Sequence, residues 1–127
     1  MSLSELSVKV DHQYQMWIKV SRHALADGRV DCAEALEWLK WHKDRKKELD
    51  LLKREIRLEI ASIRGVFKVR IASTPLGHKT DVRNEQTLAL APFEDLLRKI
   101  ERLSIEGDRL KPTLERYVES DCEAAEN

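Results

Sequence analysis

Residues 32–64 read CAEALEWLKWHKDRKKELDLLKREIRLEIASIR, a stretch that contains neither glycine nor proline. Large side chains recur in it every three or four residues, the spacing that brings residues to one face of an α-helix. This stripe comprises Trp38, Trp41, Arg45, Leu49, Leu52, Ile56, Ile60, Ile63, Phe67 and Ile71. We predict one helix over residues 32–72, about 60 Å long at about 1.5 Å per residue. A helix longer than a small globule must project or pair with another helix along its length.

The end of this segment allows a second interpretation. Gly65 interrupts it, and residues 67–71, FKVRI, alternate apolar and basic side chains as a strand does. Because the helical spacing continues through Ile63, Phe67 and Ile71, we favour a helix over a strand for residues 66–72.

A shorter amphipathic segment precedes the long one. Leu3, Leu6, Val10, Tyr14 and Trp17 share a helical face, which predicts a helix over residues 4–26. The sequence ADGRVD then ends it, and Asp31 with Glu34 forms a capping-box pattern for the next helix. So short a connection predicts that the two helices fold back on each other.

The clearest break lies at residues 73–84, STPLGHKTDVRN, where Pro75 and Gly77 predict a turn. Residues 85–91 read as a short helix or an extended lead-in. Pro92 suits a first helical turn, so we predict a helix over 92–119, kinked near Pro112, and a frayed tail over 120–127.

Charge indicates how the long segments pair. Residues 40–57 hold eight basic and four acidic side chains, whereas residues 93–126 hold six basic and ten acidic ones. Opposite excess charge favours packing of these two segments side by side. We therefore predict a single all-α domain over residues 1–127: a long antiparallel, coiled-coil-like helical hairpin with a short N-terminal helix packed on its start.

Composition narrows the class of protein. The chain has 127 residues, and its 23 Lys and Arg balance its 23 Asp and Glu, so no overall field attracts nucleic acid or an anionic membrane. Cys32 and Cys122 lie far apart and suggest two free thiols rather than a disulfide framework or a zinc site. Two free thiols are consistent with a reducing cytosol. The chain also has no signal-peptide pattern and no apolar run long enough to cross a bilayer, so we expect a cytoplasmic protein that does not interact with membranes.

The tryptophans and lysines of residues 38–47, WLKWHKDRKK, raise the possibility of a nucleic-acid surface. At about 100° per residue, Trp38 and Trp41 fall on one side of the helix and Lys40, Lys43 and Lys47 on the other. A single-strand binder needs aromatic and cationic groups on the same wall. We therefore predict that the tryptophans pack in a core or interface, and that Arg45 snorkels or pairs with an acidic residue of the last helix.

Two candidate interaction sites remain. Leu51 and Leu58, seven residues apart and followed by Gly65 and Val69, lie on the far side of the helix from the main stripe and favour a dimer or a partner groove. A basic tip near the turn comprises Arg64, Lys68, Arg70, Lys79 and Arg83, opposed in residues 64–83 by Asp81 alone.

No nucleotide-binding, hydrolase or metal-binding motif occurs in the chain, so we expect neither an enzyme nor a cofactor. The sequence predicts a non-catalytic coiled-coil interaction protein that acts as an adaptor, assembly factor or small subunit of a larger complex and forms a homodimer or binds another protein. The alternative is a small nucleic-acid-binding accessory protein that uses the basic tip.

Overall fold

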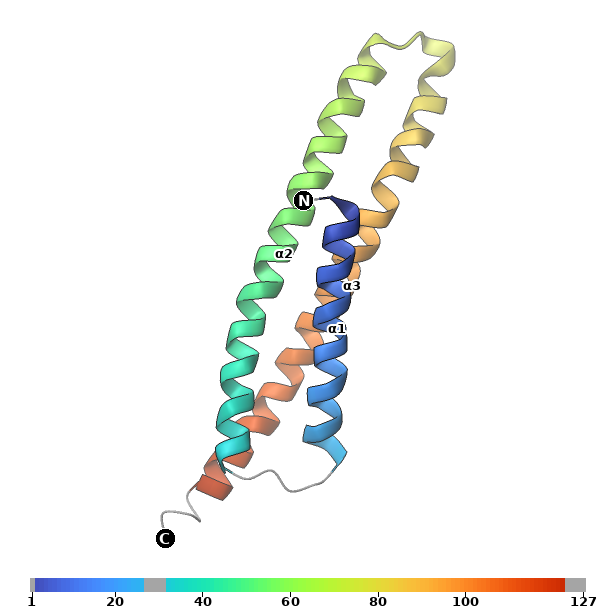
Figure 1. Ribbon diagram of the computed structural model, residues 1–127. Helices are drawn as coiled ribbons and strands as arrows, with labels where there is room; N and C mark the ends of the chain where they lie inside the picture. The colour runs from blue at the N-terminus through green and yellow to red at the C-terminus, as the bar shows by residue number, and fades with distance from the viewer. Residues whose placement is uncertain (1, 27–31, 123–127) are drawn as a thin grey trace.

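The computed structural model describes residues 2–26 and 32–122, and in this part of the chain it contains helices and no strand. The elements are α1 (Leu3–Ala26), α2 (Cys32–Ser73), the 3-10 turn η1 (Leu76–His78), α3 (Lys79–Tyr117) and the π-helical turn η2 (Val118–Cys122). Figure 1 shows α2 and α3 as a long antiparallel hairpin, with α1 lying along its lower half. The predicted all-α hairpin is confirmed, and residues 66–72 are helical rather than extended.

The core runs along the contact between the three helices. Leu6 and Val10 of α1 are buried, so this helix covers both members of the hairpin. The α2 and α3 side chains of the same cluster are Leu49, Leu52, Ile56, Ile60, Leu90, Phe93, Leu96, Ile100 and Leu103. Because α1 begins at mid-height in Figure 1, the molecule is a three-helix bundle in its lower half and a two-helix hairpin in its upper half.

The turn is shorter than predicted, and the third helix begins earlier. We expected a turn over 73–84 and a helix from Pro92, but α3 already begins at Lys79. Val82 and Leu90 are buried, as is Phe93, so the apolar face of α3 extends back to the connection with α2. Packing of this face stabilises the additional helical turns at the start of α3. Pro92 and Pro112 both lie inside α3, which continues through them although proline cannot donate a backbone hydrogen bond.

The prediction of two free thiols is wrong in this structure, because Cys32 and Cys122 form a disulfide with their Cα atoms 4.9 Å apart. Their separation of 90 residues hides this proximity in the sequence. An antiparallel hairpin returns the end of α3 to the start of α2, which brings the two cysteines together.

Some predictions fall outside the described residues. The capping residue Asp31 is one of them, and so are residues 123–127 of the predicted frayed tail, while Val118–Cys122 forms η2. Within the described chain, none of the helices is long and apolar enough to cross a membrane.

Candidate interaction surfaces

Arg45 is the most deeply buried charged side chain of α2, with 3% of its surface exposed. Its guanidinium carbon lies 4.8 Å from the ring centre of Trp17 and 5.3 Å from that of Trp41, and Nη2 donates a 3.2 Å hydrogen bond to the carbonyl oxygen of Leu103. Arg45 therefore stays in the core and bonds a carbonyl, instead of snorkelling or bonding a carboxylate as predicted. Burial lowers the pKa of Arg45 to about 10, although the negative charges of Glu106 and Asp108 act to raise it.

Gly107 makes room for this arginine. A Cβ atom at position 107 would lie 2.6 Å from Nη1 of Arg45, closer than such atoms approach in proteins, and would make a tight contact of 3.2 Å with Cε1 of His42. The absence of a side chain on α3 thus lets the guanidinium enter the interface between α2 and α3.

His42 is buried beside the same arginine. Its Nε2 lies 3.7 Å from a carboxylate oxygen of Asp108, which is also 3.7 Å from Nζ of Lys46. Burial lowers the pKa of His42; Asp108 opposes this effect, whereas Arg45, Lys111 and Lys46 add to it. A space of only about 10 Å³ adjoins these side chains, too small for a substrate, so we interpret the cluster as part of the helix packing.

The tryptophans pack as predicted from their position on the helix. Trp38 and Trp17 contact the buried pair Leu110 and Leu114 near the lower end of the bundle, and Trp41 faces Arg45. Three rings engaged in this way do not form an open platform on which bases could stack.

Leu51 and Leu58 lie outside the core, with 59% and 58% of their surfaces exposed. Val66 and Val69 extend the exposed apolar surface of α2 towards the tip. These four side chains place exposed apolar surface on the side of α2 that the core does not use.

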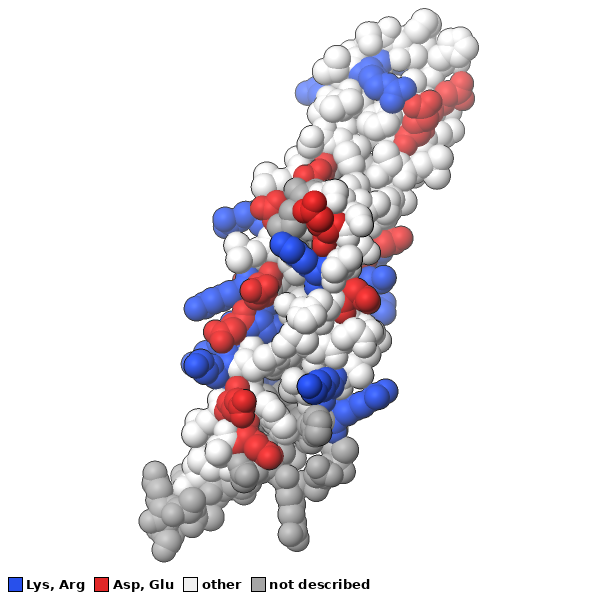
Figure 2. Space-filling model, in the orientation of Figure 1, with Lys and Arg blue, Asp and Glu red and all other residues white. Residues whose placement is uncertain are grey.

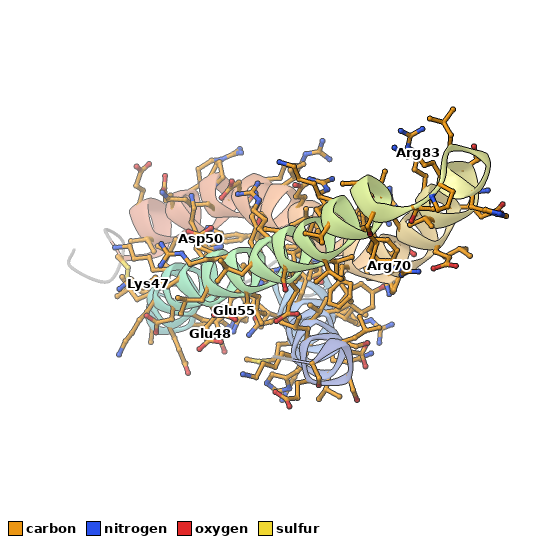
Figure 3. The ribbon with its side chains drawn as sticks, turned by 90° about the horizontal axis from the view of Figure 1, so that it is seen from above. Lys47, Glu48, Asp50, Glu55, Arg70 and Arg83 are labelled. Carbon is orange, nitrogen blue, oxygen red and sulfur yellow. A yellow bond between two sulfur atoms is a disulfide. The ribbon has the colours of Figure 1, made fainter. Side chains whose placement is uncertain are left out.

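A groove between α1 and α2 adjoins Leu51. It has a volume of about 590 Å³, and its lining residues are Val8, Lys9, His12, Gln13, Glu48, Leu51, Leu52 and Glu55. Figure 3 shows Glu48 and Glu55 on the side of α2 that faces α1, whereas Asp50 lies on the other side. The groove thus has a buried floor of Leu52 and Gln13, a rim on α1 that carries Lys9 and His12, and an acidic rim on α2.

A second groove, of about 450 Å³, lies between α1 and α3. Its apolar lining includes Val10 and Leu103, and charges of both signs mix on the α3 wall at Lys99, Arg102 and Glu106. Because the α3 wall mixes both signs of charge and the α1 wall contributes Asp11 alone, this groove selects no class of ligand by electrostatics.

The predicted basic tip is divided by the fold. Arg70 stacks over the ring of Phe67 and forms a 2.7 Å ion pair with Glu85, an acidic residue just outside the segment used for the prediction.

The other cations of the predicted tip do not share one face. Arg83 and Arg70 lie at opposite edges of the tip in Figure 3, and Lys79 is half-buried. Arg64 and Lys68 remain exposed on α2. Figure 2 shows acidic as well as basic atoms at this end of the molecule.

Among the described residues, no group of three or more His, Cys, Asp or Glu side chains is arranged to hold a metal ion. No protein-family model, curated protein or solved structure matches the chain.

Proposed function

We propose that this chain is a non-catalytic helical interaction protein, acting as an adaptor, an assembly factor or a small subunit of a larger complex. The observation that supports this function is the exposure of Leu51 and Leu58 on a helix whose other face already supplies the core. In a monomer these leucines contribute nothing to the buried interior, whereas in a complex their apolar area is removed from water.

Nucleic-acid binding through the basic tip is the second candidate. The exposed cations Arg64, Lys68 and Arg83 favour it. Phosphate contacts require several unpaired cations along one backbone path, but Arg70 is already paired with Glu85 and Arg83 lies at the opposite edge. Protein binding therefore remains the better-supported function.

A cytoplasmic location stays a prediction, and one of its reasons has changed. It rested partly on two free thiols, whereas the disulfide between Cys32 and Cys122 is of a kind that persists mainly in oxidising compartments. The redox state of these cysteines in the cell is therefore evidence for or against the predicted location.

A nuclease-treated pull-down from native extract tests the function. We expect the wild-type chain to capture a discrete set of proteins that a Leu51→Glu/Leu58→Glu variant loses. Leu88→Glu provides the matched control, because Leu88 is also a highly exposed leucine but lies on α3. Capture that depends on nucleic acid, or that is equal in all three proteins, would contradict docking through α2.

A further inference from the structure

The groove between α1 and α2 exposes apolar surface on both of its walls. Val8 of α1 is 67% exposed and Leu51 of α2 is 59% exposed, although both line the groove. Leu52 and Gln13 close its floor and are buried. A partner that enters this groove therefore covers aliphatic side chains from two helices at the same level of the bundle.

The charges on the rims are sorted by helix. Lys9 and His12 line the α1 wall, and Glu48 and Glu55 line the α2 wall. Within the part of the chain that the structure describes, none of these four side chains forms an ion pair. A partner with an acidic wall opposite α1 and a basic wall opposite α2 would pair all of them.

The chain itself provides such a partner, and we propose that a second copy docks in this groove to form a four-helix bundle from two α1 and two α2 helices. Helices α1 and α2 are antiparallel (Figure 1). A two-fold axis parallel to them places α1 of each copy beside α2 of the other, again antiparallel and at the same level. This inference rests on the proposed function, and it names a second copy of the chain as the partner that binds the exposed surface of α2.

In this arrangement the surfaces match in both chemistry and position. Lys9 and His12 of one copy lie against Glu48 and Glu55 of the other, and the two-fold axis repeats the contact. Val8 and Leu51 from both copies form an inner apolar layer. Charged positions that flank an apolar contact select the partner in helical bundles in the same way.

Sedimentation of paired charge-reversal variants tests the proposal. We expect the wild type to form a dimer between micromolar and millimolar concentration, and two variants, Lys9→Glu/His12→Glu and Glu48→Lys/Glu55→Lys, to remain monomeric. An equimolar mixture of the two variants should form a heterodimer, because each reversed wall then meets its complement in the other chain. Repulsion within one chain is unchanged by mixing, so recovery in the mixture identifies contacts between chains.

Val8→Glu is a further disrupting variant that does not depend on the rim charges, and Leu88→Glu is its control. Circular dichroism should show that each variant keeps its helices. A monomeric wild type would overturn the proposal, as would a dimer that survives Val8→Glu or a mixture of folded charge variants that stays monomeric. Captured proteins that are lost with Leu51→Glu/Leu58→Glu would still support the proposed function when the wild type is monomeric, so the two failures are distinguishable.

Discussion

Gly65 and Gly107 both lie inside long helices, but a methyl group would meet different surroundings at the two positions. Apart from the neighbouring residues and backbone of its own helix, no atom lies within 4 Å of the Cβ position at residue 65, whereas Nη1 of Arg45 lies 2.6 Å from that at residue 107. Gly65→Ala should raise the free energy of unfolding by about 1 kcal/mol through helix propensity. Gly107→Ala should not give this gain, because the same propensity is offset by an overpacking cost of about 1–3 kcal/mol when the buried guanidinium must move.

Urea denaturation of the two glycine variants and the wild type measures this difference. The variants serve as controls for each other, since the same methyl group is added to a helix in both. Equal stabilisation by both substitutions would show that Arg45 does not occupy the space beside Gly107.

His42 should make stability depend on pH. Burial lowers its pKa in the folded protein, so below about 6.5, the ordinary value, the unfolded chain binds the proton more readily. The free energy of unfolding is therefore unaffected by this residue above that pH. It should fall as the pH drops below about 6.5 towards the folded-state pKa, by at most about 1.4 kcal/mol per pH unit.

Denaturation curves at a series of pH values, for the wild type and for His42→Gln, measure this contribution. His78→Gln is the control, because His78 is an exposed histidine at the tip of the hairpin, outside the proposed dimer groove. We expect the pH dependence between 7 and 5 to be weaker in His42→Gln than in the wild type and in the control. An identical profile in all three proteins would contradict preferential protonation of the unfolded chain at His42.

At the scale of the elements, the spacing of apolar residues predicted α1 and α2 closely, with helices expected over 4–26 and 32–72 and found at Leu3–Ala26 and Cys32–Ser73. The start of α3 was missed because Pro92 suits a first helical turn and residues 79–91 have weaker apolar spacing. Burial of Val82 and Leu90 against α2 outweighs that local signal. Such a contact is tertiary, so it is not visible in the local sequence.

The candidate sites were predictable to different degrees. Leu51 and Leu58 were predicted from their position opposite the main stripe, and both are exposed on α2. The groove beside them was missed, because its walls come from two helices whose relative rotation the sequence does not specify. The pairing of Arg70 with Glu85 was missed for a similar reason, since it depends on how α2 and α3 align across the turn.

For the whole molecule, the disulfide between Cys32 and Cys122 closes a loop that contains both long helices, since the two residues are 90 positions apart. The bond limits the freedom of the unfolded chain more than it changes the folded one. Loops of this length correspond to a stabilisation of about 4.6 kcal/mol in the chain-entropy description. Adding a reductant should therefore lower the free energy of unfolding by about that amount.

Urea denaturation with and without reductant measures the effect, and thiol titration of the folded protein reports the redox state. Cys32→Ser/Cys122→Ser is the control: it should match the reduced wild type and show no response to reductant, because the chain has no other cysteine. Free thiols in folded protein purified under oxidising conditions, or equal stability in both conditions, would contradict the bond. A large loss on reduction would mean that the hairpin reaches its full stability only in an oxidising environment, which would count against the predicted cytoplasmic location.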